Sequence, residues 1–482
     1  MSILLTLAIF SGCSTDSADA GAGESQFPRQ FIGQDGTYGL FANSTPVVGA
    51  PRLLVFIIDF PDCADDESWN NMNPDPFIYS ADDIERHFFS LDRINESAAL
   101  YARPPGDYTV AHYSLRDFFY RSSYGQLDVT GEVVTVTMRN CASEYYCWDP
   151  IIHEVLEVAE AESALDWTAF DTTGTGYMDG VFFALRGFHP NAWGNLAFLN
   201  QHKDGTVIDG EVTGGALTLG EMAIGVYSTV QRVGYESNVN VLIHETVHLM
   251  GLLDFDIHAG PPLNPHGPGA TTVMNGWATI GDLPGIMKYA FGWIDPIHIY
   301  GVGETQVTLR SLSDYPQFAV IHPHGDLDNP NWFIVEYLTS TNNNFGLDET
   351  SNIHYLGYLY PVLRPGGGLR IWRVSMNPLF FTADFGLSRW GDYVQPYVFI
   401  EAIHHHSVWD DPEIFFPDHF FYPGDSLTPY TEPSSNYARS FSISDDGSLK
   451  FIETLSCSGI YLENIQIKDD TAQFTVTIRE ND

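Results

Sequence analysis

The apolar residues of this chain follow two patterns, and the change between them marks two kinds of structure. Over the first 300 residues, continuous apolar runs alternate with segments that repeat every three or four positions. A continuous run of β-branched and aromatic residues is typical of a strand buried on both faces. Beyond residue 300, short β-prone segments are separated by Gly, Asn and Pro, as in antiparallel sheets and sandwiches. The sequence therefore predicts an α+β fold with a mixed sheet first and a mostly antiparallel β region after it.

The first half is expected to combine buried strands with amphipathic helices. The runs LLVFIIDF and VFFAL predict strands at 53–60 and 181–185. Helical periodicity is expected in 81–91, 114–124, 150–164 and the segment after Asn238 or Asn240, either of which can cap that helix. After Gly125 a strand is expected, and Gly131 is expected to turn it into a second strand at 132–138. In the second half, strands are predicted at 306–309, 318–322, 332–338, 368–374, 397–403, 460–467 and 473–478.

The chemistry concentrates in one stretch, HETVHLMGLLD, which begins at His244. On a helix, His244 and His248 are four residues apart, so they lie on one face and can reach a single metal ion. Glu245 would lie beside that ion, where a carboxylate can take a proton from water without acting as a ligand. Gly251 permits a sharp exit from the helix, and the turn can return Asp254 as a third ligand. Three protein ligands with a fourth position open to water are typical of a catalytic zinc site.

Other readings of these residues stay open at this point. The stretch would also suit an amphipathic helix with two histidines satisfied inside the core. His258 and His266 lie in a Gly- and Pro-rich loop, where a solvated histidine is favoured over a ligand. His404–His406 end a predicted strand without a completing set of ligands, so a polar strand end is favoured over a second metal site. Met274, between apolar residues, indicates a core residue and nothing more by itself.

A second candidate ion site lies in the loop DTTGTGYMDG. Its glycine spacing and its terminal acids, Asp171 and Asp179, match those of a calcium loop. The middle ligand positions hold Thr173 and Thr175 instead of acids. Loss of two carboxylates weakens calcium binding, so calcium at Asp171 and Asp179 would be weak and a structural turn is favoured.

Charge and length narrow the classes of function. The chain has 62 acidic and 21 basic residues, for a formal charge of −41. This excess argues against binding nucleic acid, or an anionic membrane, through a general basic surface. At 482 residues the chain also exceeds the roughly 250–300 residues of a usual single core, so two folded units are expected.

The N-terminus predicts export. Ile3–Phe10 is a short apolar run that suits the core of a secretory signal, and the following Gly12 and Cys13 resemble a bacterial lipoprotein signal. An ordinary signal peptide with a misplaced start is the alternative. The protein is therefore expected to be secreted, or held at the outer surface by a lipid at Cys13 as its only contact with a membrane. Residues 14–26 are rich in Ser, Ala, Gly and Asp and predict a flexible tether.

The remaining cysteines agree with an oxidising compartment. Cys63, Cys141, Cys147 and Cys457 are even in number, which is consistent with two disulfides. The short separation of Cys141 and Cys147 predicts a local disulfide between them. Zinc binding by this pair is less favoured, because the spacing is long for a zinc knuckle.

Several motifs together resemble the immune inhibitor A family, which are secreted zinc peptidases of the metzincin type. The resemblance spans residues 50 to 300, and a weaker part continues downstream. It implies that His244, His248 and Asp254 bind one zinc ion, that Glu245 is the general base, and that Met274 forms the methionine turn beneath the metal. The family, like this chain, has Asp where other metzincins end their motif with His. The motifs that carry it are DFPD (59–62), SLRDFFYRSSYGQLDVTGEV (114–133), FDTTGTGYMDGVF (170–182), HETVHLMGLLDFD (244–256), VMNGW (273–277), KYAFGWIDP (288–296), NWFIVEY (331–337) and GGGLRIWRV (366–374).

These observations combine into one leading hypothesis and one rival. The leading hypothesis is a secreted or surface-anchored zinc endopeptidase that acts on protein or peptide substrates. Its expected parts are a signal and tether at 1–25, a metzincin-type catalytic domain at 26–300 and a β-rich domain at 301–482. The rival is a cell-surface binding or adhesion protein that kept a metzincin-like frame, with the C-terminal β region responsible for binding.

Overall fold

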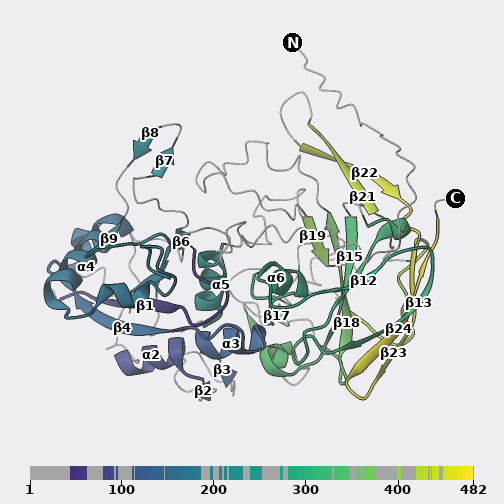
Figure 1. Cartoon of the computed structure of the whole chain (residues 1–482), viewed down its shortest axis with the longest axis horizontal. Coiled ribbons are helices and arrows are strands. Elements are labelled where there is room, and N and C mark those ends of the chain that lie inside the picture. The colour runs from purple at the N-terminus through teal and green to yellow at the C-terminus, as the bar shows by residue number, and fades with distance from the viewer. Residues whose placement is uncertain are drawn as a thin grey trace, which may run out of the picture.

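The structure of the chain is a computed structural model with a mixed α+β fold (Figure 1). One mainly parallel sheet and several mainly antiparallel sheets make up its strands, which confirms the predicted α+β class. Among the described residues, no helix combines the length and the apolar character needed to cross a membrane. The described residues are 44–61, 80–91, 94–95, 111–112, 114–145, 147–185, 196–198, 206–208, 211–213, 217–231, 239–251, 272–274, 281–327, 331–347, 354–355, 358–359, 363–375, 399–402, 420–431, 435, 437–443 and 449–480.

The first half is built on a five-stranded sheet. Across the sheet the strands are β4 (Thr130–Thr137), β1 (Arg52–Asp59), β5 (Val181–Leu185), β11 (Tyr227–Val230) and β6 (Leu196–Phe198). β1 runs parallel to β4 and β5, and β11 is parallel to β5. β6 ends the sheet by pairing antiparallel with β11. The run LLVFIIDF therefore forms the predicted central strand, displaced by a single residue.

Helices cover both faces of this sheet. They are α2 (Ala81–Phe89), α3 (Leu115–Ser122), α4 (Trp148–Glu162) and α5 (Val239–Leu249). The short α6 (Gly285–Ala290) shares a hydrophobic core with α2, α3 and α5. Alternate residues of β1 separate two hydrophobic cores, because successive strand side chains point to opposite faces. Val55 belongs to the core with α2, α3 and α5, whereas Phe56 belongs to the core with α4. The first half thus has three layers, with the sheet in the middle.

The second half contains two further sheets that pack face to face. The larger has β12 (Ile297–Ile299), β14 (Ala319–Ile321), β15 (Asn331–Leu338), β18 (Gly368–Ser375), β19 (Phe399–Ala402) and β20 (Phe420–Phe421). The smaller has β13 (Gly303–Arg310), β24 (Thr471–Ile478) and β23 (Ile460–Lys468). Val335 of the larger sheet and Phe474 of the smaller one share a hydrophobic core. The predicted strands of this region all lie within or overlap these elements.

Shorter elements complete the fold. Hairpin-like pairs are β2 (Ile94–Asn95) with β3 (Ala111–His112), β7 (Thr206–Ile208) with β8 (Glu211–Thr213), β9 (Thr218–Leu219) with β10 (Met222–Ala223), β16 (His354–Tyr355) with β17 (Tyr358–Leu359), and β21 (Tyr437–Ile443) with β22 (Leu449–Ser456). Short 3₁₀ helices are η2 (Ala142–Glu144), η3 (Trp167–Phe170), η5 (Pro323–Gly325) and η6 (Asn342–Leu347). Of these, η6 contacts α3 of the first half.

The two halves share one hydrophobic core. The face of the six-stranded sheet opposite β13, β24 and β23 presents Ile334 and Trp372. These side chains belong to the same core as Val55 of β1 and Val247 of α5. Figure 1 accordingly places α5 and α6 between the two halves. Continuous packing therefore crosses residue 300, the position predicted to separate the domains.

One local prediction is wrong. Gly131 does not turn the chain, but lies inside β4 opposite Leu53. A side chain there would collide with the Leu53 carbonyl and the Phe89 ring, so the glycine serves a close approach between elements. Of the two asparagines predicted as alternatives to cap the next helix, Asn240 lies inside α5, and Asn238 lies outside the described residues.

The predicted disulfide between Cys141 and Cys147 is also wrong. Cys141 is disulfide-bonded, whereas Cys147 is an exposed free cysteine. Cys457 is free as well, so the partner of Cys141 is neither of the other two described cysteines. Along the chain, η2 lies between the two cysteines, and Cys147 directly precedes α4. A short sequence separation alone did not identify the bond.

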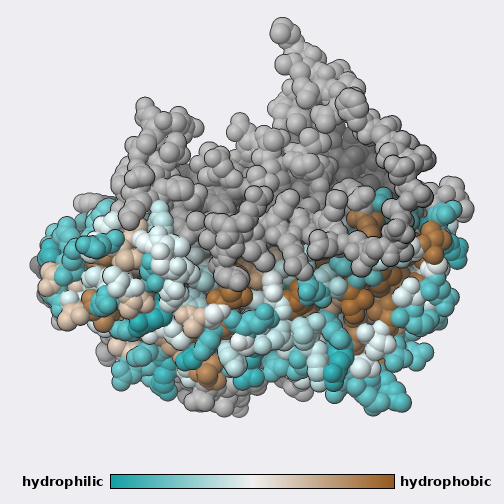
Figure 2. Space-filling model, in the orientation of Figure 1, coloured by the Kyte–Doolittle hydropathy of each residue, from teal (hydrophilic) through white to brown (hydrophobic). Residues whose placement is uncertain are grey.

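The described surface is mainly hydrophilic in the view of Figure 2, in keeping with the charge of −41. Brown areas in this view lie mostly over the C-terminal β region. Four exposed large hydrophobic residues lie in or near β12: Ile297, Tyr300, Val302 and Leu327. Single exposed apolar residues are ordinary in soluble proteins and need no special explanation.

Two buried histidines should make the fold sensitive to acid. Burial lowers the pKa of His87 on α2, and of His322 after β14, from 6.5 to about 4. His298, whose Nδ1 lies 3.0 Å from His322 Nε2, further lowers the pKa of His322. The unfolded chain binds these protons near pH 6.5 and the folded chain only near pH 4. The free energy of unfolding is therefore highest above pH 6.5. It falls between pH 6.5 and pH 4, by about 3 kcal/mol per histidine.

Urea unfolding at a series of pH values measures this effect. We expect His322→Gln to remove about half of the loss in unfolding free energy between pH 6.5 and pH 4. The matched control is His153→Gln, since His153 is exposed on α4. It should keep the wild-type pH dependence. A His322→Gln variant with the same pH dependence as the wild type would contradict the assignment.

Candidate metal centre

The helix α5 is buried along almost its entire length. Every residue from Val241 to Met250 is buried, which is typical of a helix enclosed by other layers. Three of its residues are ionisable, and His244, Glu245 and His248 expose only 4%, 4% and 8% of their surface. Burying such groups costs free energy unless they have partners or a ligand. Their presence inside this layer therefore requires a specific arrangement of neighbours.

The two histidines of α5 converge, as their spacing predicted. His244 Nε2 and His248 Nε2 are 3.1 Å apart, and the two rings are nearly perpendicular, with their centroids separated by 4.6 Å. Two nitrogens bound to one tetrahedral zinc at 2.0–2.1 Å would be about 3.3 Å apart. The separation of the two nitrogens is therefore close to that expected when both bind one zinc ion.

A backbone carbonyl fixes the orientation of the first histidine. His244 Nδ1 lies 3.0 Å from the carbonyl oxygen of Val273, which can only accept, so Nδ1 carries the proton. Nε2 of the same ring then presents its lone pair toward His248. Histidines that bind metals commonly donate their other nitrogen to a carbonyl in this way. The contact thus prepares His244 to bind a cation through Nε2.

The segment that supplies this carbonyl also contains Met274. Residues 272–274 reach α5, and Met274 is fully buried in the same core as Val247. Its amide donates to the hydroxyl of Thr272, with a distance of 3.4 Å. The structure therefore places Met274 directly after the residue that contacts His244. This is the region in which a methionine turn was expected.

The end of the helix also follows the sequence prediction. Gly251 has a φ of 98°, a left-handed conformation that glycine adopts without strain. Its amide donates to the His248 carbonyl at 2.7 Å, which closes the last turn. Such an arrangement ends a helix and redirects the chain sharply. The expected exit after His248 is therefore present.

The candidate calcium loop lies behind this helix end. The Thr45 amide donates to the Leu249 carbonyl at 2.9 Å, and the Thr45 hydroxyl donates to the Asp179 carbonyl at 2.5 Å. The Asp179 carboxylate accepts from the Arg52 amide at 2.8 Å and from the Thr172 hydroxyl at 2.7 Å. Burial raises the pKa of Asp179 to about 6. This carboxylate is thus engaged in hydrogen bonds that hold the loop to β1.

The other acid of the loop is bound by the loop itself. Asp171 Oδ1 accepts from the Thr175 amide at 3.0 Å, and Oδ2 accepts from the Gly176 amide at 2.7 Å. These bonds close a tight turn within the loop. The geometry agrees with a structural turn that supports the C-terminal end of α5.

Several predicted site residues lie outside the described part of the chain. They are Asp254, His258, His266, His404–His406 and Cys13. Within the described residues, no group of three His, Cys, Asp or Glu side chains is arranged to hold a metal. The described part of the centre is therefore the histidine pair with Glu245 beside it. Asp254 stays a prediction as the third ligand.

Two parts of the site could not be identified from the sequence. The Val273 carbonyl is a backbone group, so only its position before Met274 hinted at a role. Thr45, which links α5 to the loop at 171–179, lies outside every recognised motif.

A comparison with protein-family models finds no match to this chain, and no curated protein matches it.

The loop at 171–179 should stabilise the fold without calcium. We expect Asp179→Ala to lower the free energy of unfolding by about 2 kcal/mol, because the Arg52 and Thr172 donors lose their buried acceptor. Chemical unfolding at pH 8, with EDTA and with added calcium, measures this loss, which should be equal in both buffers. A calcium-dependent rise of the wild-type melting temperature that Asp171→Asn abolishes would instead reveal an ion site.

Proposed function

We propose that this protein is a zinc endopeptidase in which His244, His248 and Asp254 bind the ion and Glu245 is the general base. The observation that carries the proposal is the convergence of two buried imidazole nitrogens, 3.1 Å apart, on one helix. The Val273 carbonyl adds support, because it sets the tautomer in which His244 Nε2 is free of a proton.

We also propose that the chain is an immune inhibitor A-like metzincin. Three features of the described residues favour this assignment. A mixed five-stranded sheet lies beside the candidate metal helix, Gly251 ends that helix, and Met274 packs against it. Their order along the chain is that of the sequence motifs. The proposal therefore rests on the positions of these elements in the fold as well as on the sequence motifs.

The residues of α5 have distinct parts in the proposed reaction. When bound, zinc acts as a Lewis acid on the scissile carbonyl and lowers the pKa of the attacking water. Glu245 removes the proton from that water and later gives it to the leaving amine. His244 and His248 hold their nitrogens in place through the rigidity of a buried helix. The apolar surroundings strengthen each electrostatic interaction at the centre.

A polypeptide substrate is favoured by the edge of the sheet. β6 pairs with β11 on one side and with no described strand on the other, and α5 packs against both strands. An extended peptide can add to such an edge through main-chain hydrogen bonds, which do not depend on the side chains of the substrate. The edge would then place a peptide bond near the helix that bears the histidines.

An extracellular location is part of the same proposal. The disulfide at Cys141 requires a compartment in which cysteines are oxidised. Such compartments include the outside of the cell and the bacterial periplasm. We therefore propose a secreted or outer-surface enzyme, with lipid attachment at Cys13 as its means of anchoring in the second case.

Replacing the general base separates chemistry from metal binding. We expect Glu245→Ala to retain zinc while its cleavage of casein falls by about 10² to 10⁴-fold, because proton transfer is lost. Zinc content by elemental analysis and peptide release are measured on the same preparation. The control is Glu160→Ala on the exposed face of α4, which should match the wild type. Full activity of Glu245→Ala would refute the assignment.

A further inference from the structure

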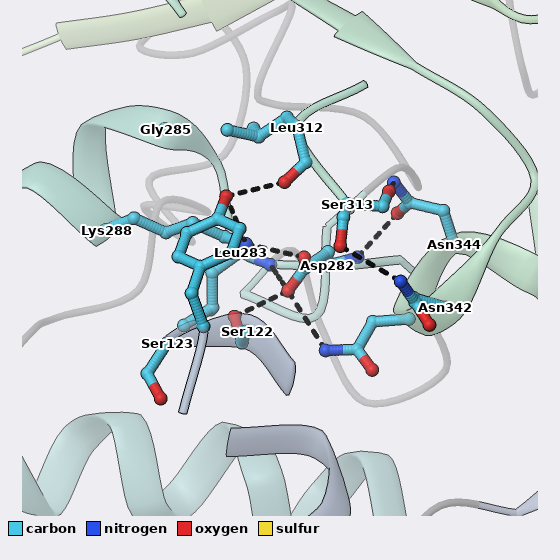
Figure 3. A network of polar contacts seen from close by, with 12 residues as sticks. Ser122, Ser123, Asp282, Leu283, Gly285, Lys288, Leu312, Ser313, Asn342 and Asn344 are labelled. Carbon is cyan, nitrogen blue, oxygen red and sulfur yellow. Dashed lines mark hydrogen bonds and ion pairs between the residues drawn. The ribbon is translucent and has the colours of Figure 1, made fainter. Parts of the chain in front are cut away.

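A buried polar network joins the two halves of the chain near the candidate metal centre (Figure 3). Its middle is Asp282, which follows the Met274 segment and exposes 2% of its surface. The Asp282 carboxylate accepts from the Ser122 hydroxyl at 2.6 Å, the Leu283 amide at 2.8 Å and Lys288 Nζ at 2.6 Å. We call Ser122, Asp282, Lys288 and Asn342–Asn344 the polar joint.

The C-terminal half supplies three asparagines to the polar joint, all from η6. Asn343 Nδ2 donates to the Asp282 carboxylate at 3.2 Å and to the Phe118 carbonyl of α3 at 3.0 Å. Asn344 Oδ1 accepts from the Asp282 amide at 2.8 Å. Asn342 Oδ1 accepts from Arg121 of α3 at 3.1 Å. One short helix of the second half therefore holds both α3 and the segment that begins at Asp282.

The joint is buried and contains charges, which limits how it can rearrange. Lys288 is completely buried, and burial lowers the pKa of its amine, although Asp282 opposes that shift. Removing one member of a buried ionic network leaves an uncompensated polar group, so such a network resists displacement. A second buried ion pair, Glu336 with Arg370, lies beside Lys288. The Glu336 carboxylate also accepts a hydrogen bond from the Gly285 amide at the start of α6. The register between α6 and the six-stranded sheet is thereby fixed.

The joint is linked to the histidines through α3. α3, which η6 holds at Phe118 and Arg121, packs directly against α5. Phe118, Met274 and Val247 also belong to one hydrophobic core. Movement of η6 would therefore be transmitted to α5.

We propose that the asparagine triplet of η6 is a positioning element of the metal centre, so that the C-terminal β half is part of the zinc-binding unit. This inference rests on the proposed zinc site. Asn343 is its most important member, because a single amide group bridges α3 and Asp282. The triplet acts on the two histidines through α3, which it holds against α5.

The test measures zinc affinity in the full-length chain, by titration against a chromophoric chelator. We expect Asn343→Ala to raise the zinc dissociation constant about tenfold, the usual loss when support of metal ligands is removed. Asn343→Asp should be worse, because it keeps the shape but sets a carboxylate against Asp282. Ser122→Ala, which removes one hydrogen bond to Asp282, should change affinity in the same direction by less, and provides the test if Asn343 variants do not fold.

The matched control is Ser435→Ala. Ser435 is equally buried in the C-terminal half and donates to the Ile460 carbonyl at 2.7 Å, far from the joint along the chain. It should lower stability without changing zinc affinity. The visible spectrum of the cobalt-substituted protein adds a signature of ligand geometry, which should change in Asn343→Ala and stay constant in Ser435→Ala.

The outcomes separate this inference from the proposed function. If the wild type binds no zinc, the proposed function fails and the inference fails with it. If the wild type binds zinc and Asn343→Ala and Ser122→Ala both keep its affinity and cobalt spectrum, the inference alone is overturned. Equal losses of zinc affinity in Asn343→Ala and Ser435→Ala would also overturn the inference. The loss of affinity would then follow the loss of stability and would not depend on where the residue lies.

Discussion

The burial of three ionisable side chains on one enclosed helix is the constraint on which the rest of this structure depends. α5 lies between the five-stranded sheet and the second half, where His244, Glu245 and His248 have almost no contact with solvent (Figure 1). Polar groups in such a layer are stable only with directed partners or a bound ion. The Val273 carbonyl and the convergence of the two Nε2 atoms meet that requirement on the protein's side.

The same constraint explains why the two halves are joined by polar contacts as well as by apolar packing. Hydrophobic packing alone tolerates small shifts between layers, whereas a network of buried charges specifies one register. Asp282 with Lys288, and Glu336 with Arg370, lie where α6 meets the six-stranded sheet. The second half is therefore continuous with the core around α5. The C-terminal β region therefore helps to hold the core around α5 in place, in addition to any binding of its own.

Local sequence patterns predicted the elements well, because periodicity and turn residues act over a few positions. LLVFIIDF became a central strand, and Gly251 ended α5 as expected. Gly131 was misjudged, since its purpose is a close approach to Leu53, and that contact is absent from the local pattern. The pairing of Cys141 likewise depends on the fold and not on the nearest cysteine.

At the candidate site, the sequence identified the side chains but not their support. Helical spacing was enough to bring His244 and His248 together. The Val273 carbonyl has no side-chain signature, and η6 lies almost 100 residues from α5, so neither could be linked to the histidines in advance. Asp254 rests on spacing and on the family resemblance. Long-range packing is thus the part of the site that local reasoning cannot supply.

Anomalous X-ray scattering at the zinc edge, from crystals of the zinc-loaded full-length protein, tests the central claim most directly. The account predicts one strong peak about 2.1 Å from Nε2 of both His244 and His248, with an oxygen ligand completing the set. The Val273 carbonyl should still accept from His244 Nδ1 in that crystal. A peak bound elsewhere on the chain, with the histidine pair in contact only with each other, would contradict the account.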